Sequence, residues 1–297
     1  MNQVDKHTID INVNSLPLLR SLLTDNWIKE ELEKNKPSIL ICLIKHREPR
    51  LQHLENNLNY LGSDEINKHK KHILGSITGD VSNLYGIISE IEVWVHLKRN
   101  NIPCDYQQRI DGLNPDFLIK LDQEDIVVEV VAIGEEENVK SKMLREISKK
   151  ENNGSWHFVV NEIEKNSDCC RLNNLLKNKG EKFKNRLKNI IIVNTSFASS
   201  GGLWSLKNAI NGYYQREEGG QQIGYISCIN KEGINIDIPA FFALKDINRS
   251  VNLVVGYHSS ISNSCSLYFH VNPYIHFTPK EEIKLNQIFS NKINGKG

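Results

Sequence analysis

Two carboxylates in apolar surroundings are the residues of this chain best suited to chemistry. Asp116 follows Asn114-Pro115 at the start of an apolar run, and Glu129 stands in the middle of the run IVVEVVAI at 126–133. A carboxylate inside a buried strand costs free energy unless a cation pairs with it. Two carboxylates close together repel each other and shift their pKa values, unless a divalent cation lies between them. The pattern therefore predicts a divalent metal site, or else a structural ion network in which a core Lys or Arg neutralises Glu129.

A third acid lies on the helix expected before these strands. Apolar residues recur at helical spacing from Leu84 to Leu97. On a helical wheel of about 100° per residue, Glu90 falls within the apolar arc and Glu92 falls on the polar face. We therefore expect Glu90 to be buried and to join Asp116 and Glu129, and Glu92 to be solvated.

The elements around these acids predict an α/β fold with a mixed central β-sheet. Strands are expected, in chain order, at 104–110, 116–121, 125–133, 157–160 and 190–197. Helices are expected at 135–150 and 172–187. The polar residues 122–125 form a hairpin turn, so the strands that they join should be antiparallel. The helical crossover before 190–197 allows a parallel pairing, so helices should flank both faces of the sheet.

Two flanking regions complete the predicted organisation. Residues 1–79 are polar and helix-like and predict an N-terminal helical region, while residues 80–297 form the α/β domain. Within this domain, a core at 80–200 precedes a strand-rich extension at 201–297. The extension should hold antiparallel strands at 223–229, 234–244, 251–258 and 266–271, and a polar helix from Lys280.

An acid on a first helix, then Pro-Asp on one strand and Glu on the next, resembles the PD-(D/E)XK nuclease superfamily. The helix also resembles the first helix of that family, with SEIE at 89–92 and LKRNN at 97–101. The resemblance covers roughly 80–200 and implies a restriction-endonuclease-like core that hydrolyses phosphodiester bonds with Mg²⁺ (or Mn²⁺). It implies that Asp116, Glu129 and the backbone carbonyl of Val130 are metal ligands. Glu90 would bind the metal directly or through water.

The chain departs from the family at the motif lysine, because Val131 stands where the lysine belongs. A lysine there orients or deprotonates the attacking water and stabilises the transition state, and valine does neither. Lys140 and Lys142, on the helix that follows, are the candidates to reach back in its place. The alternative is a catalytically silent nuclease fold that binds nucleic acid or a protein partner.

Composition limits the partners. Lys plus Arg number 37 and Asp plus Glu number 36, so no global field draws the chain to nucleic acid or membrane. A local basic segment at 140–188 carries 13 Lys and Arg against six acids, which suits phosphate contacts or, equally, a solvated helix face. DNA is the expected substrate, in restriction, repair or anti-phage defence by analogy, and a homodimer is compatible with such a role.

The six cysteines and the hydropathy pattern bear on location. No two cysteines form a C-x-x-C pair, so a structural zinc site is not expected. Their scatter predicts reduced thiols in a cytoplasmic protein. The adjacent Cys169 and Cys170 are expected to be buried or idle thiols, the alternative being a redox-active pair. No signal peptide and no apolar stretch of membrane-spanning length are recognised, so we expect no membrane partner.

Overall fold

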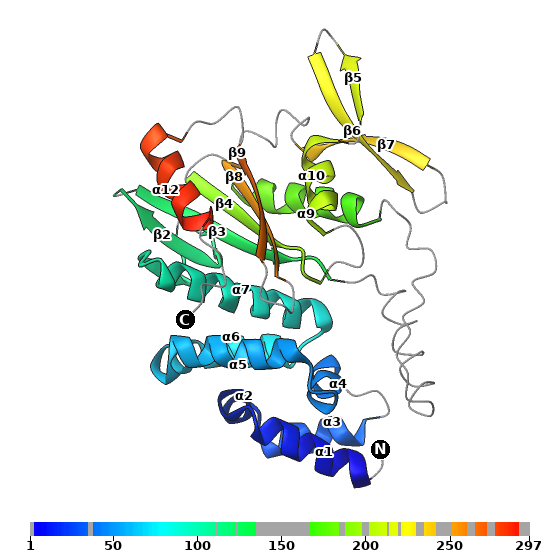
Figure 1. The fold of residues 1–297 in the computed structure, drawn as a ribbon, viewed down its shortest axis with the longest axis vertical. Coiled ribbons are helices and arrows are strands. Elements are labelled where there is room, and N and C mark those ends of the chain that lie inside the picture. Colours follow the sequence, from blue (N-terminus) through cyan, green and yellow to red (C-terminus); the bar gives the residue numbers. More distant parts are fainter. Residues whose placement is uncertain are drawn as a thin grey trace.

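The computed structural model of the chain confirms a mixed α/β fold with helices on both faces of a mixed sheet (Figure 1). The residues that it describes are 3–34, 38–110, 112–122, 124–134, 167–183, 188–197, 202–212, 214–218, 221–229, 235–241, 251–259, 265–271 and 277–290. The helix expected at 135–150, the strand expected at 157–160 and most of the basic segment lie outside these residues. No helix among the described residues is long and apolar enough to cross a membrane.

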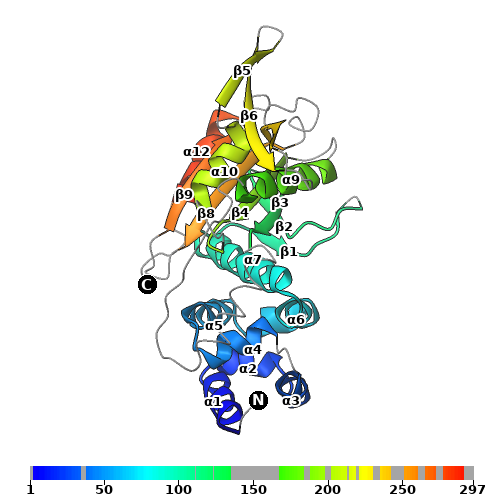
Figure 2. The same cartoon turned by 90° about the vertical axis from the view of Figure 1, so that its right-hand side faces the viewer.

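The N-terminal region is helical, as predicted. Its helices are α1 (Gln3–Asn14), α2 (Pro17–Leu22), α3 (Asp25–Glu33), α4 (Ile39–Lys45), α5 (Pro49–Leu61) and α6 (Ser63–Ile77). A seventh helix, α7 (Val81–Arg99), begins at Asp80, whose side chain accepts a hydrogen bond from the Asn83 amide. Figures 1 and 2 show α7 between the sheet and helices α5 and α6. Both long faces of α7 are therefore covered, and its apolar residues share one core with the N-terminal helices and the sheet.

The central sheet has six strands in the order β1-β2-β3-β4-β8-β9. The strands are β1 (Cys104–Tyr106), β2 (Phe117–Leu121), β3 (Glu124–Ala132), β4 (Lys188–Asn194), β8 (Leu253–Ser259) and β9 (Cys265–Val271). The first three form an antiparallel meander, and β4 runs parallel to β3, as predicted. The first strand stops at Tyr106 rather than at 110, because Gln107 has a φ of 57°.

The expectation of an all-antiparallel extension is wrong for β8, which pairs parallel to β4. Some fifty-eight residues separate the two strands, long enough for the crossover that a parallel pair needs. That crossover contains α10 (Gly202–Asn211), which the sequence analysis did not predict, and a second sheet. The second sheet is antiparallel and consists of β5 (Tyr214–Glu218), β6 (Gln221–Ile229) and β7 (Asn235–Pro239).

The two faces of the central sheet carry different helices. Helices α7 and α12 (Pro279–Ser290) pack on one face, and α9 (Ser167–Lys182) and α10 pack on the other. Strand β3 serves both layers, since Val128 and Val130 join the first core while Val127 and Val131 join the second. Glu129 alternates with the first pair and therefore faces α9.

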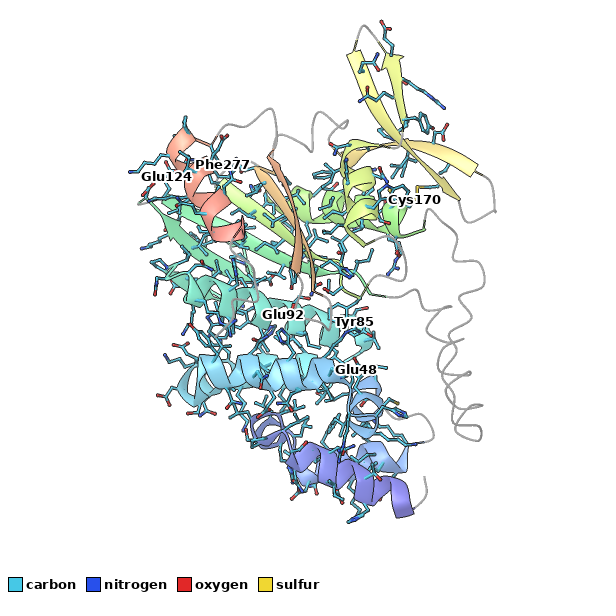
Figure 3. The ribbon with its side chains drawn as sticks, in the orientation of Figure 1. Glu48, Tyr85, Glu92, Glu124, Cys170 and Phe277 are labelled. Atoms are coloured by element: carbon cyan, nitrogen blue, oxygen red, sulfur yellow. A yellow bond between two sulfur atoms is a disulfide. The ribbon has the colours of Figure 1, made fainter. Side chains whose placement is uncertain are left out.

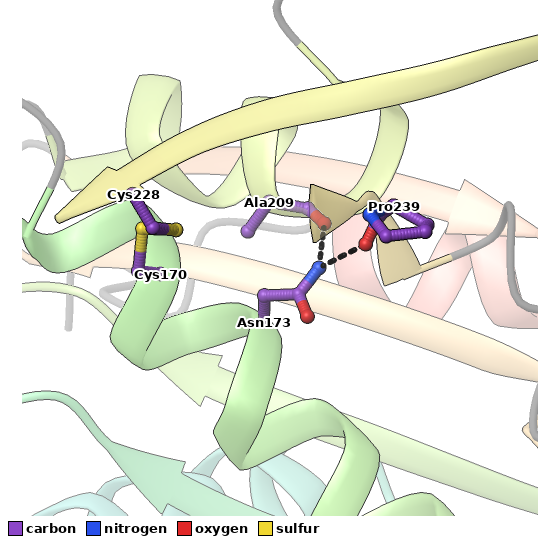
Figure 4. The surroundings of a disulfide bond; sticks show 5 residues. All are labelled: Cys170, Asn173, Ala209, Cys228 and Pro239. Atoms are coloured by element: carbon purple, nitrogen blue, oxygen red, sulfur yellow. Dashed lines mark hydrogen bonds between the residues drawn. A yellow bond between two sulfur atoms is a disulfide. The ribbon is translucent and has the colours of Figure 1, made fainter. Parts of the chain in front are cut away.

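A disulfide corrects the expectation of reduced thiols. Cys170 of α9 is bonded to Cys228 of β6 (Figure 4). Beside it, the Asn173 amide donates to the carbonyl oxygens of Ala209 at 3.1 Å and Pro239 at 3.3 Å. These bonds tie α9 to α10 and to the second sheet.

Candidate functional site

Asp116 and Glu129 lie side by side at one end of the β2–β3 hairpin. Phe117 is the register partner of Val128, and continuing the antiparallel register by one position sets Asp116 opposite Glu129. Asp116 Oδ2 also accepts a hydrogen bond of 2.7 Å from the Val130 amide. The hairpin thus brings the two acids together as the sequence predicts.

Glu90 of α7 reaches the same place from the other side of the sheet. Its Oε2 accepts a hydrogen bond of 2.5 Å from the Tyr106 hydroxyl and lies 3.3 Å from His72 Nε2 of α6. The side chain of Glu90 is 14% exposed, so solvent screens it only in part. Its negative charge is one of the causes that raise the pKa of Asp116, after burial.

The pKa of Asp116 is raised by its surroundings. Burial, the negative charge of Glu90 and that of Glu129 raise the pKa of Asp116 from 3.8 to about 7, in that order of size. Lys179 and the Val130 amide act in the opposite direction and do not offset the rise. A carboxyl group in this state favours a proton or a metal cation.

Two lysines of α9 supply positive charge beside Glu129. Lys179 Nζ donates a hydrogen bond to Glu129 Oε2, and Lys182 Nζ lies 3.8 Å from the same oxygen. Burial lowers the pKa of Lys179, but Glu129, Asp116 and Glu90 together raise it above its ordinary value. Lys179 is therefore a charged amine held against the acid cluster.

Sequence reasoning placed Lys179 among the basic residues of 140–188 that could contact phosphates, and did not expect its contact with Glu129. Lys140 and Lys142, expected to replace the absent motif lysine, lie outside the described residues. Val131 packs in the apolar layer under α9, as its side chain requires. The signal for Lys179 was present in the basic stretch before β4, but only the docking of α9 on β3 distinguishes it from its neighbours. His72 and Tyr106 carried no sequence signal.

The assignment of Glu92 to solvent is wrong. Glu92 is 7% exposed and accepts hydrogen bonds from Tyr257 Oη at 2.7 Å and Asn194 Nδ2 at 3.1 Å. His53 of α5 lies 3.4 Å away. The helical wheel assumed water on the second face of α7, where α5 packs instead (Figure 3). Glu90 is the more exposed acid of the two.

The resemblance implies a divalent metal ion held by these acids. Within the described ranges, no three Asp, Glu, His or Cys side chains are arranged to hold a metal ion. Glu129 faces Lys179, and Glu90 faces Tyr106 and His72. The available atoms are nevertheless carboxylate oxygens, which Mg²⁺ prefers. Because the Val130 amide points to Asp116, the carbonyl of the same residue leaves β3 on the same side. The chemistry of the donors therefore fits Mg²⁺.

Comparison of the chain with known protein families, with curated proteins and with solved structures finds no match. The geometry of the site is therefore the basis for proposing a function.

Proposed function

We propose that this protein is a Mg²⁺-dependent nuclease that hydrolyses phosphodiester bonds in DNA, on a restriction-endonuclease-like core. The observation that carries the proposal is that the β2–β3 hairpin sets Asp116 opposite Glu129, with Lys179 donating to Glu129 Oε2. The raised pKa of Asp116, caused by burial and by the charges of Glu90 and Glu129, agrees with it. A purely structural ion network has no need of three mutually opposed acids, since each addition lowers the stability of the fold.

The order of elements supports the same proposal. Helix α7 is followed by the antiparallel meander β1-β2-β3, then by α9 and by β4 parallel to β3. The resemblance implies such a core over roughly 80–200. Glu90 is on α7, Asp116 directly precedes β2 and Glu129 is on β3.

Each residue of the site has a role in the proposal. Asp116, Glu129 and the Val130 carbonyl would hold Mg²⁺, with Glu90 bound directly or through water. Bound Mg²⁺ lowers the pKa of a water ligand and neutralises charge on the phosphate. Lys179 takes the role that Val131 cannot fill, because its charged amine orients the attacking water and stabilises negative charge on the phosphate oxygens. Lys182 adds a second positive charge on the same side of Glu129.

The test is cleavage of supercoiled and linear DNA by the purified chain in Mg²⁺ or Mn²⁺. Asp116→Asn and Glu129→Gln should abolish cleavage, and Lys179→Ala should slow it about 10²–10³-fold, as loss of one charge-stabilising donor does. Glu92→Gln is the matched control, because it removes a buried negative charge outside the site, and this variant should cut at the wild-type rate. Undiminished cleavage by Asp116→Asn would contradict the proposal.

A second candidate is a catalytically silent member of the same fold that binds nucleic acid. The ion pair between Glu129 and Lys179, together with Val131, favours it, because the acid already has a cation and the motif lysine is absent. This candidate predicts that the wild type binds DNA and cuts neither DNA nor RNA in any divalent cation.

A further inference from the structure

The outer face of α6 carries a run of basic residues. Beyond Asp64 and Glu65 in its first turn, α6 contains no acid through Ile77. Its apolar residues Ile66, Ile73 and Ile77 face the core, whereas Lys68, Lys70, Lys71 and His72 are exposed. His69 is half-buried, with its ring against those of Trp94 and Tyr106.

A shallow, open surface depression of about 500 Å³, called the α6 cavity below, lies on this face and is lined, among the described residues, by those of α6 alone. The described residues that line it are Lys68, His69, Lys71, His72, Gly75 and Ser76. Two ammonium groups and two imidazoles therefore border it, and no carboxylate does so among the described residues. A side chain at Gly75 would meet no atom within 4 Å, so the approach to the cavity is open there.

The cavity adjoins the acid site. His72, in its lining, lies 3.3 Å from Glu90. The ring of His69 is 4.9 Å from that of Tyr106, whose hydroxyl donates to Glu90. Glu65 is the other acid close to this face, 3.5 Å from Lys68 and 3.6 Å from Lys98. A molecule seated in the cavity would thus reach the edge of the carboxylate cluster.

An acid cluster repels the polyanion on which a nuclease acts, and the formal charge of the chain is only +1. A local cationic surface beside the acids has to supply the attraction. We propose that the α6 cavity binds backbone phosphates of the DNA duplex and holds the strand across Glu90 toward Asp116. The inference rests on the proposed function for the identity of the ligand, and it adds the surface that receives it.

The test compares Lys68→Ala/Lys71→Ala with Lys29→Ala/Lys207→Ala in the full chain. Both double variants lose two exposed lysines, but Lys29 is on α3 and Lys207 is on α10, outside the residues that line the cavity. Binding of a fluorescein-labelled duplex is followed by anisotropy in EDTA, which prevents cleavage, from 50 to 200 mM salt.

Each lost phosphate contact reduces the slope of log affinity against log salt by about 0.9. For two contacts, the wild-type affinity should fall about 12-fold more than that of Lys68→Ala/Lys71→Ala over this fourfold range of salt. Lys29→Ala/Lys207→Ala should keep the wild-type slope. Equal slopes for the two double variants, or no binding of the duplex by the wild type, would overturn the proposal.

Two further measurements separate the remaining outcomes. If sedimentation with phosphatidylserine vesicles depends on Lys68 and Lys71 while duplex binding does not, the cavity serves an anionic lipid surface and the proposal is wrong. If the duplex binds through these lysines but the wild type never cuts, the cavity assignment stands and the nuclease proposal fails. If the wild type cuts and Lys68→Ala/Lys71→Ala binds and cuts equally well, only the cavity assignment fails.

Discussion

Helix α7 contributes two acids, Glu90 and Glu92, to two different polar clusters. Around Glu92 lie neutral donors, the Tyr257 hydroxyl and the Asn194 amide, with His53 nearby. Glu90 accepts a hydrogen bond from the Tyr106 hydroxyl and lies 3.3 Å from His72, and its negative charge also acts on Asp116 and Lys179. In the first cluster, hydrogen bonds stabilise one carboxylate. In the second, the negative charges of neighbouring carboxylates add to burial in raising the pKa of Asp116.

The difference shows that burial alone does not mark a functional site. Glu92 is the more buried acid, yet its hydrogen bonds join α7 to β4 and β8 and account for its position. Asp116 has a raised pKa first because it is buried, and then because the negative charges of Glu90 and Glu129 repel its own. Burial combined with opposing acids, rather than burial alone, distinguishes a site prepared for a cation.

The largest effect expected from this comparison is a pH dependence of stability that comes from Asp116. The folded protein holds a proton on Asp116 up to about pH 7, whereas the carboxyl of the unfolded chain has the ordinary value of 3.8. The free energy of unfolding should therefore fall as pH rises from about 4 to 7, by roughly 4 kcal/mol if Asp116 acts alone. Urea unfolding at several pH values measures the fall.

Asp116→Asn is the control for this dependence, because the amide keeps the shape of the side chain and cannot titrate. The difference in stability between the wild type and this variant should shift in favour of the variant as pH rises. A difference that stays constant from pH 4 to 8 would mean that the acids of the site do not oppose one another.

The next effect is structural and tests the other cluster. Glu92→Ala should destabilise the protein by about 3 kcal/mol, because it leaves the Tyr257 hydroxyl and the Asn194 amide without their buried acceptor. Glu92→Gln retains an acceptor and should cost less than half as much. Thermal or urea unfolding measures both, and equal stability of Glu92→Ala and wild type would remove the structural role assigned here.

The smallest effect is a response to the metal ion alone. If Mg²⁺ binds with a Kd of about 1 mM, 10 mM Mg²⁺ should stabilise the wild type by about 1.4 kcal/mol. The shift should grow above pH 7, where Asp116 is ionised, and vanish in Asp116→Asn/Glu129→Gln. An equal shift in Glu92→Gln and in this double variant would indicate that Mg²⁺ binds elsewhere.

Local features of the sequence predicted the acid half of the site. The turn at Asp122, with a φ of 51° that aspartate tolerates, fixes the register of the hairpin and hence the pairing of Asp116 with Glu129. This inference needed only the chain within the hairpin. The helical wheel was less successful on α7, because Glu92 and not Glu90 is the more buried acid.

The features that sequence reasoning missed depend on contacts between distant elements. The burial of Glu92 requires α5 on the second face of α7, and the role of Lys179 requires α9 on β3. The parallel pairing of β8 with β4 follows from strand order, which hydropathy does not encode. Spacing also gives no means of pairing Cys170 with Cys228.

The Cys170–Cys228 disulfide closes a covalent ring that contains the lysines of the site and none of its three acids. Its two cysteines are 58 positions apart, and the ring that they close contains Lys179, Lys182 and all of β4. Glu90, Asp116 and Glu129 all precede the ring in the chain. Reduction of this disulfide therefore opens the covalent ring that contains Lys179 and Lys182. It leaves the covalent connections of the three acidic residues unchanged.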